Sequence, residues 1–121
     1  MESKRTLVVG ASLKPNRYSY QAVSRLTQNN HPVYAFGLRE GEVGETSISK
    51  LWPVDEEFDT VTLYLNPKRQ EEYYLRILGL NPRRVIFNPG TENPVFQKQL
   101  TEAGIEVEVA CTLVLLSIEN Y

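Results

Sequence analysis

The chain has 121 residues, of which 41% are hydrophobic and 23% charged, and its net charge is −2. This length suffices for one hydrophobic core, so we expect a single domain over residues 1–121. The acidic balance argues against a broad surface for nucleic acid or anionic membranes, and the one cysteine, Cys111, excludes an intramolecular disulfide.

We expect no signal peptide and no membrane-spanning helix in this sequence. The charged N-terminus leads directly into a short apolar run and does not resemble a signal peptide. The longest apolar run, residues 109–118, is about half as long as a membrane-spanning helix needs to be. We therefore expect a soluble, cytoplasmic protein that contacts neither membranes nor nucleic acid.

Apolar, β-branched runs alternate along the chain with amphipathic segments. Strands are predicted at residues 6–9, 33–36, 59–65, 84–87 and 105–109, with a further short strand near 46–48. Helices are predicted at residues 19–28, 68–80, 93–103 and 111–117, and residues 38–47 read as a glycine-rich loop. This alternation is typical of an α/β domain in three layers, with a mainly parallel sheet of five or six strands and helices on both faces.

The stretch RTLVVGASLKPNRYSY, residues 5–20, is where we expect the binding site to be centred. Its strand ends at Gly10, Ala11 and Ser12, and a polar loop containing Arg17 leads into the helix. Such a strand–turn–helix unit directs backbone N–H groups and a helix N-terminus towards the space above the strand, which suits a phosphate. The small residues allow a ligand to approach the backbone closely.

The residues that follow the other strands complete the predicted site, because ligands of open α/β sheets bind beyond the carboxyl ends of the strands. These residues are small, amide-bearing or cationic: Gly37, Leu38 and Arg39; Leu65, Asn66 and Pro67; and Asn88, Pro89 and Gly90. The two Asn-Pro pairs also fit a second interpretation, as helix caps and strand terminators. No Asp, Glu or His stands directly at a strand end, so the site is expected to bind a ligand without an acid–base group.

The residues after the first two predicted strands indicate which class of nucleotide the site binds. The GxGxxG fingerprint is absent, and so is the acidic residue that holds the ribose of NAD at the end of the second strand. Arg39 stands there instead and suits a ribose phosphate, as in NADP or coenzyme A. Without the middle glycine, close approach of a pyrophosphate in the NADP manner is less favourable. We predict a phosphorylated adenine nucleotide held by Arg17, Arg39 and the helix N-terminus.

Four segments, VVGAS…NRYSY, DTVTLYLNP, RVIFNPGTEN and ACTLVLLS, resemble the small stand-alone CoA-binding proteins of bacteria. Those proteins are similar to the N-terminal CoA-binding domain of the succinyl-CoA synthetase alpha subunit. The resemblance spans nearly the whole chain and implies a Rossmann-like fold with coenzyme A as the ligand. The phosphohistidine and nucleotide-grasping machinery of the synthetase lies outside this resemblance, so its activity is not implied.

The resemblance also assigns regions of the ligand to positions of this chain. It implies phosphate contacts by Gly10, Ala11, Ser12, Arg17, Ser19 and Tyr20, an adenosine end at Gly37, Leu38 and Arg39, and a pantetheine path along Leu65, Asn66, Pro67, Asn88, Pro89 and Gly90. This chain has FGLRE after the second strand, where the larger relatives more often have an Asn-Pro-Lys type turn.

Three functions remain open at this point. The first is a module that binds CoA or acyl-CoA and has no catalytic machinery of its own. The second is an NADP-binding, oxidoreductase-type subunit that needs a partner for catalysis. The third is a redox-sensing interaction protein that presents Cys111, although a lone cysteine after a strand is usually a small buried hydrophobe. Trp52 most simply covers the sheet edge, and with Tyr121 it permits a homodimer or a protein partner.

Overall fold

The computed structural model describes residues 2–121 and contains one seven-stranded sheet in the order β3-β4-β2-β1-β5-β6-β7. Six strands run parallel to one another: β1 (Thr6–Val9), β2 (Val33–Phe36), β4 (Thr46–Ser49), β5 (Thr60–Leu63), β6 (Arg84–Phe87) and β7 (Glu106–Val109). Strand β3 (Gly41–Val43) pairs antiparallel with β4. The predicted mainly parallel sheet is confirmed, with one strand more than the upper expectation.

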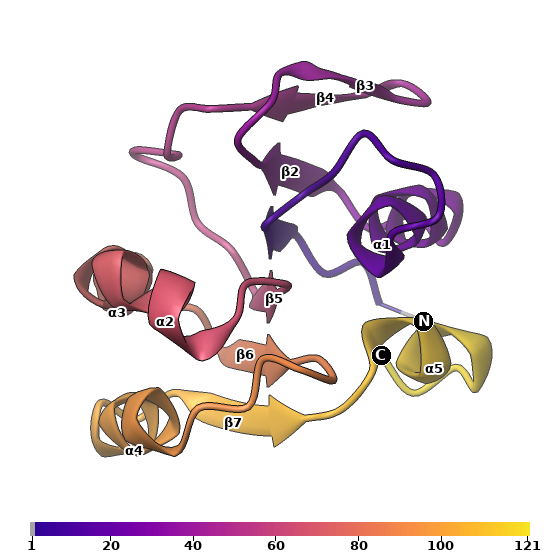
Figure 1. Cartoon of the computed structure of the whole chain (residues 1–121). Coiled ribbons are helices and arrows are strands. Elements are labelled where there is room, and N and C mark those ends of the chain that lie inside the picture. The colour runs from indigo at the N-terminus through magenta and orange to yellow at the C-terminus, as the bar shows by residue number, and fades with distance from the viewer. Residues whose placement is uncertain (1) are drawn as a thin grey trace.

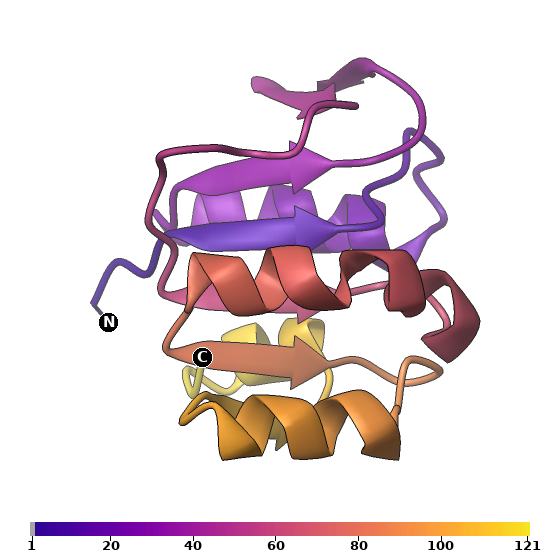
Figure 2. The same cartoon turned by 90° about the vertical axis from the view of Figure 1, so that its left-hand side faces the viewer.

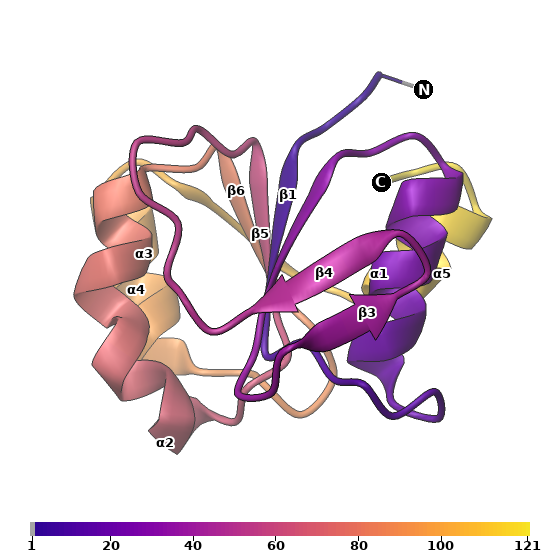
Figure 3. The same ribbon diagram turned by 90° about the horizontal axis from the view of Figure 1, so that it is seen from above.

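Helices cover both faces of the sheet (Figures 1 and 3). Helices α1 (Tyr18–Gln28) and α5 (Thr112–Ser117) lie on one face, and α2 (Pro67–Gln70), α3 (Tyr74–Leu80) and α4 (Pro94–Glu102) lie on the other. From β1 the chain crosses to β2 on one side of β1 and later returns to β5 on the opposite side. This reversal is the switch point at which doubly wound sheets hold their ligands. The fold is Rossmann-like. None of the helices within residues 2–121 is both long and apolar enough to cross a bilayer.

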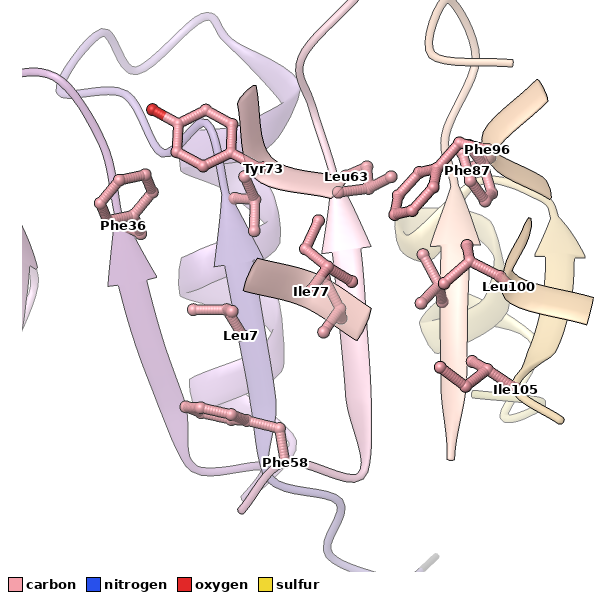
Figure 4. Packing of buried hydrophobic residues seen from close by; sticks show 13 residues of the cluster. Leu7, Phe36, Phe58, Leu63, Tyr73, Ile77, Phe87, Phe96, Leu100 and Ile105 are labelled. Atoms are coloured by element: carbon pink, nitrogen blue, oxygen red, sulfur yellow. The ribbon is translucent and has the colours of Figure 1, made fainter. Parts of the chain in front are cut away.

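The central strands are buried on both faces, as their continuous apolar and β-branched sequences require. The core under α3 and α4 contains Leu7, Val9, Leu63, Ile77, Phe87, Phe96 and Leu100 (Figure 4). The core under α1 and α5 contains Val8, Val23, Leu26, Ile86, Leu115 and Leu116. Alternate residues of β1 thus belong to opposite cores, because successive side chains of a strand point to opposite faces.

The predicted loop at residues 38–47 is wrong in part, because β3 forms there. Gly44, with φ of +61°, makes the turn that pairs β3 with β4. A Cβ atom at Gly41 would lie 2.6 Å from Leu13 Cδ2, so β3 packs directly against the loop after β1. Strand β3 forms because it pairs with β4 and packs against Leu13 of a distant segment. The hydrophobic periodicity of residues 38–47 does not indicate either contact.

The predicted helix at 68–80 is interrupted by the 3₁₀ turn Glu71–Tyr73 between α2 and α3. The turn places Tyr73 against Trp52, with ring centroids 5.5 Å apart and nearly parallel, and edge-on to Phe36. The strand expected at 59–65 is confined to Thr60–Leu63. The strand expected in the core at 105–109 is the edge strand β7, where Glu106 and Val109 are exposed.

Candidate functional site

A cavity of about 630 Å³ opens at the carboxyl ends of β1, β2, β5 and β6. The four strands end level, because Val9 pairs with both Phe36 and Leu63, and Leu63 pairs with Phe87. Their ends therefore form a row that extends for about 14 Å from β2 to β6 at the usual strand spacing. Figure 2 shows these parallel strands pointing to the same side of the molecule, where the loops after them gather.

The cavity brings together most of the residues predicted from the sequence. Those that line it are Gly10, Ala11, Ser12, Arg17, Ser19, Gly37, Leu38, Arg39, Leu65, Asn66, Pro89 and Gly90. Tyr20, Pro67 and Asn88 are not among the lining residues. Sequence reasoning did not include Leu13, Lys14, Tyr18, Phe36, Tyr64, Arg69, Tyr73 and Thr91, which also line the cavity. Lys14 could have been predicted from the polar loop after β1. Arg69 and Tyr73 lie within a predicted helix, and nothing in the sequence indicated that they reach the cavity.

The turn after β1 requires glycine at its first position. Gly10 has φ of +95°, and a Cβ atom there would lie 3.0 Å from Leu65 Cδ2. The backbone N–H groups of Gly10 and Ala11 both donate to the carbonyl oxygen of Phe36, each at 2.9 Å. These two N–H groups hold the turn to β2 and are not available to a ligand.

Further donors lie at the N-terminus of α1. Arg17 is the N-cap residue, and its side chain accepts no hydrogen bond from the first turn; that turn also contains no acidic residue. The first N–H groups of a helix have no partner within the helix and carry partial positive charge. Since Tyr18 and Ser19 line the cavity, this end of α1 offers donors to an anion there.

The charged residues that line the cavity are all cationic: Lys14, Arg17, Arg39 and Arg69. None of them takes part in the ion pairs of residues 2–121, which involve only Arg5, Arg83 and Arg84 as cations. A cleft lined by charge of one sign focuses the electrostatic field and attracts ions of the opposite sign. In a chain of net charge −2, this local excess indicates an anionic ligand.

Gly37 brings the loops after β1 and β2 into contact. A Cβ atom at this position would lie 2.4 Å from the carbonyl oxygen of Ala11, closer than any real Cβ contact. The Gly37 N–H donates to the carbonyl oxygen of Ser49 at 3.0 Å, so the same residue also joins β4. The floor of the cavity at this point is formed by backbone, because a side chain has no space there.

The two Asn-Pro pairs, which look alike in the sequence, have different roles. The Asn66 Oδ1 atom accepts from the Arg69 backbone N–H at 2.9 Å and caps α2, and Asn66 also lines the cavity. The Asn88 side chain is buried, donates to Thr62 Oγ1 and accepts from the Thr112 backbone N–H. The Asn88 amide therefore joins β6 to β5 and α5, which is the structural interpretation of this pair.

The cavity rim on the β5 and β6 side is fixed by a buried glutamine. Gln70 Nε2 donates to the carbonyl oxygens of Leu65 and Thr91, both at 2.8 Å. Gln70 Oε1 accepts from Asn93 Nδ2 at 2.9 Å, and Asn93 also caps α4. These bonds hold the loops after β5 and β6 in one arrangement, so this half of the cavity is preformed.

The described lining contains no carboxyl, imidazole or thiol group. His31 is buried elsewhere, and the half-buried Cys111 is also not a lining residue. Two buried or half-buried phenols, Tyr64 and Tyr73, do line the cavity, and burial raises the pKa of each above that of an ordinary tyrosine. Both phenols therefore stay protonated near neutral pH, and the site offers hydrogen bonds and positive charge.

Comparison with known proteins agrees with this geometry. Residues 4–117 match the family described as CoA binding domain, and the chain belongs to this family. A crystal structure of an uncharacterized protein is 46% identical over the full length of both chains, with a TM-score of 0.96. The cell-free ID.343 protein from Thermus thermophilus is 27% identical, with a TM-score of 0.83 over 98% of this chain and 91% of that one. A hypothetical protein from Pyrococcus horikoshii OT3 is 26% identical, with a TM-score of 0.82 over 93% and 81% of the two chains. No curated protein matches the sequence.

Proposed function

We propose that the protein binds coenzyme A or an acyl-CoA in the carboxyl-end cavity and supplies no acid–base or nucleophilic group of its own. The observation that carries the proposal is a cavity lined by cations without protein partners and by no carboxylate, in a member of the CoA-binding domain family. Coenzyme A is a polyanion at one end and a neutral thiol-bearing arm at the other, so it suits a site with an uneven distribution of charge.

The distribution of the cations gives the ligand its direction. Lys14 and Arg17 belong to the loop between β1 and α1, and Arg39 follows β2, so these three lie on the β1–β2 half of the cavity. The free N–H groups of α1 lie on the same half. We assign the diphosphate and the 3′-phosphate of CoA to this half, because charge-assisted hydrogen bonds from Arg and Lys are the strongest contacts available to them.

The other half of the cavity suits the pantetheine arm. Leu65, Asn66, Pro89, Gly90 and Thr91 line this half with an amide and a hydroxyl among apolar groups; the fourth lining cation, Arg69, is on α2, the helix after β5. Such a surface can pack against the methylene groups of pantetheine and bond to its amides. The exposed apolar side chains of Tyr18 and Leu38 line the cavity on the phosphate half and offer apolar surface to the adenine ring.

The test is calorimetric titration of the protein with CoA, 3′-dephospho-CoA, NADP and NAD. We expect CoA to bind most tightly and Arg17→Met to weaken CoA binding about tenfold, the loss of one hydrogen bond to a charged group. Arg25→Met, an exposed substitution in the last turn of α1, is the matched control and should leave the affinity unchanged. Tighter binding of NADP than of CoA would overturn the proposal in favour of an oxidoreductase-type subunit.

A separate assay tests the proposal that the protein has no catalytic activity of its own. Release of free thiol from acetyl-CoA, followed with a colorimetric thiol reagent, should equal the rate without protein. Acceleration that disappears in Arg17→Met would show that the cavity itself turns over the thioester, and this part of the proposal would then be wrong.

A further inference from the structure

The side chain of Tyr73 brings a hydroxyl group to the cavity that the fold itself does not use. Tyr73 is only 7% exposed and lines the cavity. The hydroxyls of Tyr34, Tyr74 and Tyr121 all form hydrogen bonds within the protein, whereas that of Tyr73 has no partner among residues 2–121. Three polar side-chain atoms of these residues are fully buried without a partner, and the Tyr73 hydroxyl is not one of them. The hydroxyl is therefore accessible from the cavity.

The ring that carries this hydroxyl is held by three contacts. It lies nearly parallel to Trp52 and edge-on to Phe36, with ring centroids 5.5 Å apart in both pairs. The Arg76 guanidinium lies 5.6 Å from the centroid of the Tyr73 ring. A phenylalanine ring could make the same contacts, so the packing does not require the hydroxyl. A ring fixed in this way holds its hydroxyl in one position, and a ligand can bind to it without ordering a flexible side chain.

These contacts place Tyr73 at the end of β2, on the β1–β2 half of the cavity. Phe36 is the last residue of β2, and Arg39, which also lines the cavity, follows it by three residues. Figure 4 shows the Tyr73 ring beside Phe36 at the carboxyl ends of the strands, with its oxygen pointing away from Leu63 and the core. Tyr73 and Arg39 are therefore both available to a group bound beyond the end of β2.

The Tyr73 hydroxyl suits an anionic acceptor. Burial raises the pKa of this phenol, so the hydroxyl keeps its proton at neutral pH and can donate it in a hydrogen bond. Hydrogen bonds to a charged acceptor are shorter and stronger than those between neutral groups. Arg17 and the N-terminus of α1 approach the cavity from the other face of the sheet and offer donors to the diphosphate (Figures 1 and 3). The ribose phosphate is the remaining anion of CoA.

We propose that Tyr73 is a specificity-determining residue whose hydroxyl donates a hydrogen bond to the 3′-phosphate of CoA. The proposal rests on the proposed function, since it uses the direction assigned to CoA across the strand ends. Tyr73 and Arg39 hold this phosphate together, one through a neutral donor in a fixed position and the other through its charge. The site therefore prefers CoA to the same ligand without the ribose phosphate.

The experiment is calorimetric titration of the wild type and of Tyr73→Phe with CoA and with 3′-dephospho-CoA. We expect the variant to bind CoA about tenfold more weakly, the loss of one hydrogen bond to a charged group, and 3′-dephospho-CoA less than about twofold more weakly. Tyr34→Phe removes a hydroxyl that bonds to the Leu51 carbonyl oxygen and does not line the cavity; this control should leave both affinities unchanged. Urea unfolding, followed by the fluorescence of the single tryptophan, Trp52, should have the same midpoint in Tyr73→Phe and the wild type.

Three results would overturn the inference and leave the proposed function standing. The first is a Tyr73→Phe variant that binds CoA as tightly as the wild type. The second is an equal loss of affinity for CoA and 3′-dephospho-CoA, because the hydroxyl would then contact another part of the ligand. The third is a lower urea midpoint in Tyr73→Phe, because the hydroxyl would then serve the fold. A wild-type protein that does not bind CoA would instead overturn the proposed function itself.

Discussion

Cationic side chains at the two ends of the sheet have different surroundings. At the amino ends of the strands, the arginines are paired within the protein: Arg5 with Glu56, Arg83 with Asp59 and Glu106, and Arg84 with Glu108. At the carboxyl ends, Lys14, Arg17, Arg39 and Arg69 line the cavity without an acidic partner. The difference teaches that the charge of a residue does not decide its role here; the presence of a carboxylate within reach does.

Arg84 shows how the fold holds a cation at the amino end, although its buried Nη2 atom has no hydrogen-bond partner among residues 2–121. The buried Arg84 donates from Nε to Thr60 Oγ1 and from Nη1 to Glu108, both at 3.1 Å, and its guanidinium lies 4.5 Å from the centroid of the Tyr121 ring. Burial alone would raise the pKa of the neighbouring Asp59 carboxyl, but hydrogen bonds from Arg83 and Thr60 hold this pKa below its ordinary value. The charged side chains at this end of the sheet therefore form ion pairs and hydrogen bonds that stabilise the fold.

The largest expected effect is on stability, from Arg84→Met. Removing a buried cation that is paired and hydrogen-bonded should cost about 3 kcal/mol of the free energy of unfolding. The affinity for CoA should not change, because Arg84 lies at the end of the sheet away from the cavity. Urea denaturation and calorimetry measure the two effects. Arg83→Met, at a half-exposed ion pair, is the control and should cost no more than about 1 kcal/mol; equal losses in the two variants would contradict the comparison.

Gly37→Ala should have the next largest effect and act at the carboxyl end. The new methyl group would overlap the carbonyl oxygen of Ala11, and forcing the two loops apart should cost about 2 kcal/mol. Because both loops line the cavity, CoA binding should weaken as well. Gly79→Ala, in α3 with no atoms nearby, should instead stabilise the protein by roughly 0.5 kcal/mol, as alanine does in a helix. A Gly37→Ala variant as stable as the wild type would show that the loops can separate freely.

Arg39→Met sharpens the assignment of the phosphate half. We expect it to weaken CoA binding about tenfold without changing stability, since its side chain bonds to nothing else in residues 2–121. Binding of 3′-dephospho-CoA should hardly change, because the phosphate that Arg39 holds is then absent. Equal losses for both ligands would place Arg39 at the diphosphate. Rising salt should weaken CoA binding to the wild type more than to the variant.

The smallest effect is the pH dependence contributed by His31 at the amino end. Burial, together with the nearby charges of Lys4 and Arg84, lowers the pKa of this imidazole, and its Nδ1 atom accepts from the Lys4 N–H at 2.9 Å. The neutral form is therefore favoured in the folded state. Its contribution to stability is present above pH about 6.5, the ordinary histidine pKa, and is lost as the pH falls below that value. Urea midpoints at several pH values should show this decline, and His31→Asn should reduce it; an unchanged decline would assign it to other groups.

Local sequence was sufficient for the central strands and for the position of the cavity. The runs ending at Val9, Phe36, Leu63 and Phe87 are apolar and β-branched because parallel strands are buried on both faces, and this pattern is visible without a structure. Parallel strands joined through helices bring their carboxyl ends to one edge, so the residues after each strand were predicted to meet there. Gly10, Arg17, Gly37 and Pro89 line one cavity for this reason.

The tertiary structure alone decided which polar groups in that region remain free. The N–H groups of Gly10 and Ala11 are taken up by Phe36, and the amide of Asn88 by Thr62 and Thr112, partners that lie 24 or more residues away in the chain. Arg69 lines the cavity from α2, the first turn of the predicted helix, which directly follows β5. Hydrophobic periodicity determines which face of a segment is buried, whereas hydrogen-bond partners are set by distant segments that meet only in the folded chain. The local sequence therefore determined the strands and the position of the site. The tertiary structure determined which N–H groups and which cations at the site have no partner within the protein.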